Sequence, residues 1–276
     1  CERVNHIGET ALMRNDLLRT QGDHNRILRE RIPRVVVAME DPFPAVSGRG
    51  IRRLREEGDV EVSVGLLEEE ARSLNAAFIT AHTLHRPYVT LKWAQSIDGY
   101  MDRVRSSREE SPEVFSSPLH QRIVHQVRLA HEAILVGYRT ALLDDPQLGN
   151  RLWYGPSPLR VILDPHLQLP QDLRVFTDSS CPTLVLHLSS VVAPSSQEEG
   201  RSHLRYRALE GTKLTPEAIL SALYEGEGVQ SLLVEGGAAT LELFMAGGLY
   251  DEILLEVSPR ALGKGVLAPS LGDRRG

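Results

Sequence analysis

Three short segments place charged and hydroxyl side chains directly after apolar runs, where they could bind or activate a ligand. The first segment is Leu91 to Gly99, in which Lys92, Ser96 and Asp98 accompany the end of a strand-like run. Ligands of open α/β folds collect at the carboxyl ends of strands, so these side chains are candidates for ligand binding. The alternative is that Lys92 is a solvated edge charge and that Asp98 only shapes a turn.

The second segment, Val136 to Leu148, combines an apolar run with a hydroxyl and two adjacent carboxylates, and a cation follows it. These side chains are Thr140, Asp144, Asp145 and then Arg151. A connecting loop does not require so many polar groups, which favours a binding site. The alternative is that Thr140 caps a helix and that the two aspartates before Pro146 form a turn.

The third segment, Leu233 to Leu241, predicts a strand, a turn of small residues and a helix. Gly236 and Gly237 would let the backbone approach a phosphate, and a helix N-terminus supplies unpaired N–H groups. The glycine spacing of the Rossmann dinucleotide fingerprint is absent. Glu235 ends the apolar run, so its carboxylate is either a ligand contact or a costly burial.

The composition is that of a folded globular protein. The chain has 276 residues, of which 41% are hydrophobic and 25% charged, and its formal net charge is −6. Mild acidity argues against non-specific binding of nucleic acid or membranes, because both need a basic surface. An anionic ligand must therefore be held by a few local cations. The sequence has two cysteines and no C-x-x-C pair, which fits a reducing compartment. It shows neither a signal peptide nor an apolar run of about 20 residues. These features predict a cytoplasmic protein.

Strands and helices are expected to alternate, which predicts a mostly parallel sheet covered by helices on both faces. A polar stretch before Arg86-Pro87 separates two units, and residues 1–31 suggest helical pieces. A surface loop is expected at 189–202. The expected strands are 35–39, 60–64, 88–93, 133–137, 159–163, 183–187, 230–234 and 252–257, and the expected helices are 51–58, 67–78, 117–130 and 241–245.

Together the three segments resemble the reductase domain of the bifunctional deaminase/reductase of riboflavin biosynthesis. The resemblance covers about Leu84 to Val266 and is carried by R-P-Y-V-T-L-K-W-A-Q-S-I-D-G, A-I-L-V-G-Y-R-T-A-L-L-D-D-P-Q-L, L-R-V-I-L-D and V-E-G-G-A-A-T-L. It implies a fold similar to dihydrofolate reductase, which binds NADPH without the Rossmann glycines. It also implies NADPH-dependent reduction of the ribosyl group of 5-amino-6-(5-phosphoribosylamino)uracil to the ribityl form.

The resemblance further implies roles for individual residues. Catalytic roles fall on Lys92, Asp144 and Glu235. Substrate contacts fall on Lys92, Arg128, Leu148, Arg151 and Glu235, and cofactor contacts fall on Ala94, Thr140, Asp144, Gly237, Ala238, Ala239, Thr240 and Leu241, the last five within the turn Gly237 to Leu243. The chemistry agrees, because Arg128 and Arg151 can bind the substrate phosphate through charge-assisted hydrogen bonds.

Two positions depart from the family pattern. Val114 stands where the family often has an aromatic residue, and the segment Val104 to Pro112 is unusually charged. We expect cofactor stacking to be altered there.

Residues 1–83 resemble the tail of the same family's zinc deaminase domain, through I-P-R-V-V-V-A-M-E-D-P-F-P-A-V-S-G-R-G-I. Zinc deamination needs ligands from H-x-E and P-C-x-x-C type motifs. Cys1 and His6 alone cannot form a zinc site. We therefore expect 1–83 to be a partial or degenerate deaminase-like domain with no zinc and no deaminase activity, and 84–276 to be the NADPH-dependent reductase domain.

Two other functions stay open. One is a related reductase of a pterin-like substrate, and the other is a catalytically inert scaffold or assembly subunit. The converging charges of Lys92, Asp144, Arg151 and Glu235 argue against an inert scaffold. The expected partners are a small-molecule substrate and further copies of the chain in a homo-oligomer, with no nucleic acid and no membrane.

Overall fold

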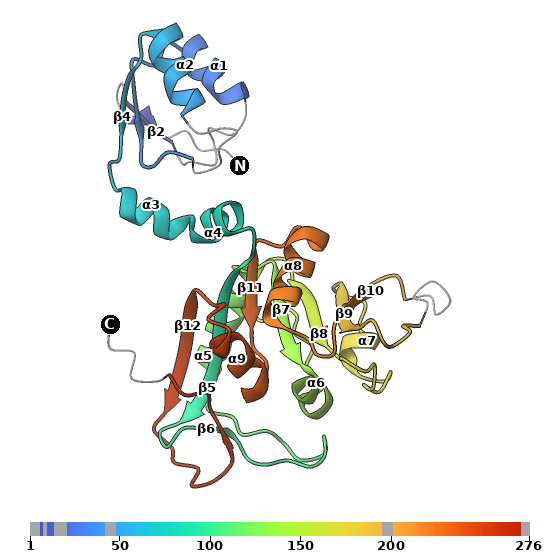
Figure 1. Cartoon of the computed structure of the whole chain (residues 1–276). Helices are drawn as coiled ribbons and strands as arrows, with labels where there is room; N and C mark the ends of the chain where they lie inside the picture. The colour runs from blue at the N-terminus through green and yellow to red at the C-terminus, as the bar shows by residue number, and fades with distance from the viewer. Residues whose placement is uncertain (1–5, 8–9, 14–20, 42–47, 195–200, 272–276) are drawn as a thin grey trace. The chain divides into compact units, whose positions relative to one another are not determined.

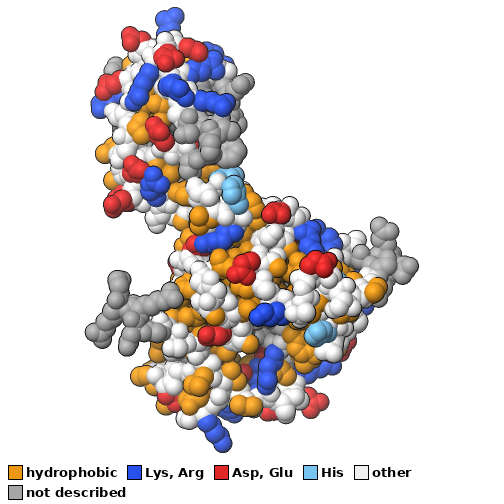
Figure 2. All heavy atoms as spheres, in the orientation of Figure 1, with side chains coloured by type: hydrophobic (Ala, Val, Ile, Leu, Met, Phe, Trp, Pro, Cys, Tyr) orange, Lys and Arg blue, Asp and Glu red, His pale blue; other side chains and the backbone are white. Residues whose placement is uncertain are grey.

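The computed structural model describes residues 6–7, 10–13, 21–41, 48–194 and 201–271. The chain divides into two compact units, Cys1–His85 and Arg86–Gly276 (Figure 1). On the face shown in Figure 2, acidic and basic side chains are interspersed over both units. Among the described helices, none is long and apolar enough to cross a membrane.

The first unit contains a four-stranded sheet in the order β1-β2-β3-β4. Its strands are His6–Ile7, Thr10–Met13, Arg34–Val37 and Glu61–Val64, and only the β1–β2 pair is antiparallel among them. Its core includes Val35, Ile51 and Leu54, from β3 and from helix α2 (Arg49–Gly58). The other helices are α1 (Gln21–Arg29), α3 (Glu68–Leu74) and α4 (Ala76–Leu84). The strands expected at 35–39 and 60–64 and the helix expected at 51–58 are confirmed.

Two expectations for this unit need correction. The helical pieces expected within residues 1–31 are confirmed at α1, but Leu12 and Met13 lie in strand β2, because β2 pairs in parallel with β3 and the partner strand overrides local preference. The single helix expected at 67–78 is interrupted at Asn75, which ends α3 and precedes α4. The Asn75 side-chain amide donates to the carbonyl oxygen of Ala71 at 2.7 Å and so satisfies an end carbonyl of α3.

The second unit is built on a seven-stranded sheet in the order β10-β9-β8-β7-β11-β5-β12. Every neighbouring pair of these strands is parallel, which confirms the expected mostly parallel sheet. The strands are β5 (Tyr88–Ser96), β7 (Ala133–Gly137), β8 (Leu159–Leu163), β9 (Thr183–Leu188), β10 (Leu204–Leu209), β11 (Ser231–Val234) and β12 (Glu252–Ser258). Strands β6 (Tyr100–Asp102) and β13 (Val266–Leu267) form a small antiparallel sheet.

Helices cover both faces of the large sheet. Leu135 and Val234 pack with α8 (Pro216–Glu227) and α9 (Ala238–Ala246), whereas Ile134 and Leu233 pack on the opposite face with α5 (Pro118–Leu129), α6 (Tyr138–Asp144) and α7 (Arg174–Thr177). Each fully buried aliphatic side chain of this kind contributes about 1.5–3 kcal/mol of transfer free energy. The central strands are apolar throughout because both of their faces are buried.

The order of the strands determines where a ligand can bind. From β7 the chain proceeds outward to β10, and it then returns to insert β11 between β7 and β5. The carboxyl ends of β7 and β11 therefore lie side by side next to the middle of β5, where the strand order reverses (Figure 1). Such a reversal is where α/β sheets of this type bind ligands. The three chemically promising segments of the sequence follow these same three strands.

Candidate active site

Lys92, Arg128 and Glu235 lie on the same side of the sheet. The neighbours of Lys92 in β5 pack toward α8 and α9, so the alternation of side chains along a strand directs Lys92 toward α5. Glu235 follows β11 in phase with Leu233, which also faces α5. Arg128 is in the last turn of α5. Two strands and one helix thus bring the three charges together.

Arg128 and Glu235 form a bidentate ion pair. Arg128 Nε donates to Glu235 Oε1 at 3.1 Å and Nη2 donates to Oε2 at 2.6 Å, while Nη1 donates to the carbonyl oxygen of Gly149 at 3.3 Å. The two side chains are only 13% and 9% exposed. Burial by itself raises the pKa of Glu235, but Arg128, followed by Lys92, brings this pKa below its ordinary value. Glu235 is therefore a carboxylate at neutral pH.

Arg151 and Lys92 differ from Arg128 in having free charged groups. The guanidinium of Arg151 is exposed, and neither it nor the ammonium of Lys92 forms a hydrogen bond or ion pair with a described residue. All guanidinium nitrogens of Arg128 are engaged with Glu235 and Gly149. The prediction that Arg128 binds the substrate phosphate stays a prediction, and this pairing makes Arg151 and Lys92 the more available cations.

His125 holds the backbone beside Arg151. The backbone N–H of Arg151 donates to Nδ1 of His125 at 3.2 Å, and His125 is buried in α5. Burial, together with the positive charges of Arg128 and Arg151, lowers the pKa of His125. The neutral ring can accept at Nδ1, which the protonated ring cannot. Asn150 lies beside His125, and both polar atoms of its side-chain amide are buried.

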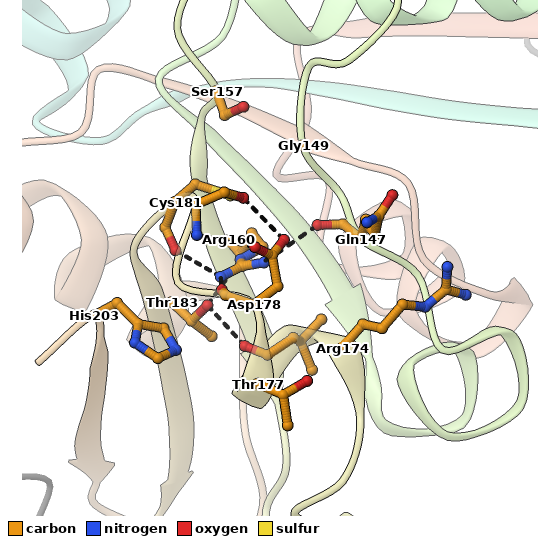
Figure 3. A network of polar contacts seen from close by, with 12 residues as sticks. Gln147, Gly149, Ser157, Arg160, Arg174, Thr177, Asp178, Cys181, Thr183 and His203 are labelled. Atoms are coloured by element: carbon orange, nitrogen blue, oxygen red, sulfur yellow. Dashed lines mark hydrogen bonds and ion pairs between the residues drawn. The ribbon is translucent and has the colours of Figure 1, made fainter. Parts of the chain in front are cut away.

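Arg160 contacts the chain at Gln147, shortly before Arg151, as Figure 3 shows. Its side chain is fully buried, and its Nη1 donates to the carbonyl oxygen of Gln147 at 3.4 Å. It also donates to the Oγ1 of Thr183 at 2.8 Å and to the carbonyl oxygens of Asp178 and Cys181, both at 2.5 Å. Arg160 is not among the residues named from the sequence, although an arginine inside the apolar run L-R-V-I-L was a usable signal.

Leu148 is anchored in the core of this region. Its side chain is 2% exposed and packs with residues of β7 and β8, and its φ is +56°. Only the backbone of Leu148 can therefore reach a ligand. The predicted substrate contact at this position stays a prediction, with its backbone as the group involved.

Asp144 and Asp145 have different roles. Asp145 accepts a hydrogen bond from the backbone N–H of Arg174 at 2.6 Å. Arg174 is the first residue of α7, so Asp145 satisfies one N–H group at the start of this helix. Asp144 pairs with Arg105, whose Nη2 donates to Asp144 Oδ1. Burial raises the pKa of Asp144 against the pull of Arg105. Arg105 was absent from the sequence-derived candidates, although the charged run Val104 to Pro112 marked its position.

The turns after β7 and β11 pack backbone against backbone. A Cβ on Gly236 would lie 2.8 Å from the backbone nitrogen of Gly137, so only glycine fits. The N–H of Gly237 donates to Thr140 Oγ1 at 2.7 Å, which joins the two turns. In the described structure no side chain caps the N-terminus of α9. A close-approaching glycine turn that leads into an uncapped helix fits a phosphate-bearing cofactor.

The remaining sequence-derived cofactor residues surround this turn. Ala94 is half-buried two residues after Lys92, so it lies on the same face of β5. The side chains of Thr240 and Leu241 are buried in the protein, which leaves their backbone groups for a ligand. Ala238 and Ala239 form the first turn of α9. These cofactor contacts stay predictions.

Ser96 and Asp98 close a turn instead of lining the site. Asp98 accepts from the backbone N–H groups of Leu262 and Gly263 at 3.0 and 2.7 Å, and Ser96 Oγ accepts from the N–H of Tyr100 at 2.9 Å. The structure thus favours the turn interpretation for Asp98. Strand β5 continues to Ser96, so Lys92 lies within the strand rather than at its end.

Two expectations are not tested by the described residues. Cys1 and the side chain of His6 lie outside them, so the expected absence of zinc stays a prediction. Within the described ranges, no group of three or more His, Cys, Asp or Glu residues could hold a metal ion. Val114 is exposed, and its carbonyl oxygen accepts from Arg260 at 3.4 Å. Altered cofactor stacking at Val114 stays a prediction.

Comparison with known proteins now decides the family, because the family model of the RibD C-terminal domain matches residues 87–275. The chain belongs to the RibD C-terminal domain family. It is 38% identical over 260 residues to the riboflavin biosynthesis protein RibD of Aquifex aeolicus, and the match covers 93% of this chain and 69% of the relative. It is 36% identical over 247 residues to RibD of Bacillus amyloliquefaciens, which covers 89% and 64%.

The fold also agrees with a solved structure of this family. The crystal structure of a diaminohydroxyphosphoribosylaminopyrimidine deaminase/5-amino-6-(5-phosphoribosylamino)uracil reductase from Thermotoga maritima superposes with a TM-score of 0.79 at 30% identity. The match covers 94% of this chain and 70% of that one. The chain thus spans about two thirds of the length of its RibD relatives. The expected fold class of the reductase domain and the resemblance to that domain are confirmed, and a reductase of this family implies a nicotinamide cofactor. The deaminase-like character expected for residues 1–83 stays a prediction.

Proposed function

We propose that the chain reduces the ribosyl group of 5-amino-6-(5-phosphoribosylamino)uracil to the ribityl form with NADPH. The Thermotoga maritima relative is described as a reductase of this compound. The observation that carries the proposal is the group of Lys92, Arg151 and the ionised Glu235 where the strand order reverses, in which neither cationic group has a hydrogen bond or short ion pair with a described residue. In a chain of net charge −6, such a grouping suits a phosphorylated substrate.

The charges of Arg151, Glu235 and Lys92 suit each of them to a different role in the reaction. Arg151 binds the phosphate, because its guanidinium is exposed and has no described partner. Glu235 accepts hydrogen bonds from substrate N–H or hydroxyl groups, because its lowered pKa leaves it without a proton to donate. Lys92 donates a proton to the ribose ring oxygen as the bond between this oxygen and C1′ breaks. Bound NADPH supplies the hydride that C1′ accepts.

The cofactor would be held by the two packed turns. The turn at Gly237 and the N-terminus of α9 would bind its phosphates, and Thr140, Asp144 and Ala94 would lie beside it. This assignment is supported by the close backbone approach at Gly236 and by the uncapped first turn of α9.

A substrate comparison tests the proposed reaction. The purified chain is incubated with NADPH and, in separate assays, with the phosphorylated uracil substrate, its dephosphorylated analogue or a dihydropterin. We expect loss of reduced nicotinamide absorbance with the phosphorylated substrate and a product heavier by two hydrogens. Turnover of the dihydropterin alone would support a pterin reductase, and no NADPH binding at all would support an inert scaffold.

A further inference from the structure

Arg105 is buried in a segment that is otherwise mostly exposed. It lies between β6 and α5, in residues 103–113, and its side chain is only 6% exposed. Its Nε donates to Asp102 Oδ2 at 2.7 Å, and its Nη2 donates to Asp144 Oδ1. Its Nη1 donates to the carbonyl oxygens of Leu143 and Glu110 at 3.1 and 3.2 Å. One guanidinium therefore connects two carboxylates and two backbone carbonyls.

These contacts attach the segment to α6. Leu143 and Asp144 are the last residues of α6, where unpaired carbonyl groups favour a positive charge. Arg139, near the start of α6, donates from Nη2 to the carbonyl oxygen of Arg105 at 2.9 Å. Asp102 also closes the segment on itself, because its Oδ1 accepts from the N–H groups of Arg103 and Glu113 at 2.8 and 2.9 Å. The segment is therefore a closed loop fixed to α6 through Arg105.

The pairing leaves part of Asp144 available. Its Oδ1 is bound by Arg105, whereas its Oδ2 forms no hydrogen bond with any described residue, and the side chain is 32% exposed. Asp144 also lies a few residues after Thr140, which contacts the glycine turn. A carboxyl group with one oxygen fixed by a guanidinium and the other free is suited to accept a hydrogen bond from a hydroxyl group of a ligand.

We infer that Arg105 is a positioning residue for the cofactor, holding Asp144 so that its free oxygen accepts a hydrogen bond from a cofactor hydroxyl. This inference rests on the proposed function, in which Asp144 contacts NADPH. Arg105 does not touch the cofactor in this arrangement. It acts through the orientation and the charge of Asp144.

The charge of Asp144 depends on Arg105. Burial raises the pKa of Asp144, Arg105 opposes that rise, and the nearby carboxylate of Asp102 adds to it. Without the guanidinium, burial and the carboxylate of Asp102 both raise the pKa of Asp144 unopposed. Asp144 would then take up a proton at a higher pH than in the wild type, and a protonated carboxyl group is a poorer acceptor.

A double-mutant cycle tests the inference. The wild type, Arg105→Met, Asp144→Asn and the double variant are titrated with NADPH, and nicotinamide fluorescence gives Kd at several pH values. Arg108→Met is the matched control, because Arg108 is in the same segment but forms an exposed ion pair with Asp172 at 2.9 Å. Circular dichroism and thermal unfolding establish that each variant is folded, and Arg105→Lys replaces Arg105→Met if the latter is not.

We expect Arg105→Met to raise the Kd for NADPH about ten-fold, the effect of roughly one charge-assisted hydrogen bond. Asp144→Asn should have a similar effect, and the double variant should be no worse than Asp144→Asn. The Kd of Arg105→Met should rise further as the pH falls, while that of Asp144→Asn should not depend on pH in this way. Arg108→Met should bind NADPH like the wild type.

The outcomes separate the inference from the proposed function. If Asp144→Asn weakens NADPH binding but Arg105→Met does not, or if the two effects are additive, Arg105 does not position Asp144 and the inference is wrong. If Asp144→Asn leaves the Kd unchanged, the assignment of Asp144 to the cofactor fails, and the inference fails with it. If the wild type binds no NADPH, the proposed function itself fails.

Discussion

Arg128→Met is the substitution that most directly tests the architecture of the site. Methionine keeps most of the apolar stem of Arg128 but removes the guanidinium that donates to both carboxylate oxygens of Glu235. Glu235, with a side chain only 9% exposed, would then be a buried carboxylate without its main partner. The variant therefore measures the free energy of an uncompensated buried charge.

The expected loss of unfolding free energy follows from this geometry. Breaking a buried ion pair by removing one partner costs about 3–5 kcal/mol. Lys92 remains near Glu235 and offsets part of the loss, so we expect a value near the lower end, about 3 kcal/mol. The double variant Arg128→Met/Glu235→Gln removes both charges and should lose clearly less than Arg128→Met alone.

The tryptophans make the assay specific to one unit. The chain has two tryptophans, Trp93 and Trp153, and both belong to the unit Arg86–Gly276. Their fluorescence during urea unfolding therefore reports on this unit alone. Arg108→Met is the surface control, and loss of its exposed ion pair should change the free energy of unfolding far less than loss of the buried pair.

The dependence on pH gives a second readout. Because the pKa of Glu235 is lowered in the folded protein, the ion pair contributes its full stability above the ordinary carboxyl value of 4.5 and loses it as the pH falls below that value. The difference between the wild type and Arg128→Met should therefore shrink in acid. If Arg128→Met costs as little as Arg108→Met, or if the two single substitutions are additive, the reasoning about a buried pair is refuted.

Three further substitutions test the ligand contacts. Gly237→Val places a branched side chain where a Cβ would lie 2.9 Å from Thr140 Oγ1. The Kd for NADPH should therefore rise while the substrate KM changes little. An unchanged Kd in the folded variant would exclude this turn from the cofactor site. Arg151→Ala should lower kcat/KM roughly ten- to a hundred-fold, the equivalent of about 1.5–3 kcal/mol. If that variant prefers the phosphorylated over the dephosphorylated substrate as strongly as the wild type, Arg151 does not bind the phosphate. In the wild type, KM should rise as the pH falls below 6.5, because the lowered pKa of His125 shifts its protonation to that range and the protonated ring releases the Arg151 N–H. His125→Asn keeps an acceptor there and should flatten this profile, and an unchanged profile would exclude His125 as its source.

The strands of the large sheet could be predicted where burial on both faces imposes an apolar run. Strands β7, β9 and β11 are buried along their whole length, so their sequences are apolar runs that predict buried strands. Strand β10 was missed because it lies at the edge of the sheet and carries the polar run R-Y-R. Helix α6 was missed because it begins at Tyr138, directly after β7, with no side-chain cap to announce it.

The site could be predicted in its residue types but not in its pairings. Lys92, Arg128, Arg151 and Glu235 were all named from the sequence. The structure places Lys92 and Arg128 beside Glu235, directly after the central strand β11, and places Arg151 beside His125 of α5. Arg128 is neutralised by Glu235, whereas Arg151 is not. This difference depends on side-chain alternation in β5 and β11 and on the position of α5, which are properties of the tertiary structure. Sequence alone therefore treated Arg128 and Arg151 as equivalent phosphate ligands.

The burial of Arg105 also could not be predicted from the sequence. A charged run such as Val104 to Pro112 normally indicates a solvated loop, and most of this one is exposed. One of its arginines is nevertheless buried, because Asp102 and the C-terminus of α6 together supply carboxylates and carbonyls for every nitrogen of its guanidinium. Burying a charge is tolerated only when its partners are complete, and here Asp102 and Glu110 are local whereas Leu143 and Asp144 lie 38 and 39 residues further along the chain. A residue that holds a candidate cofactor contact in place is for that reason recognisable only once α6 and the loop are seen together.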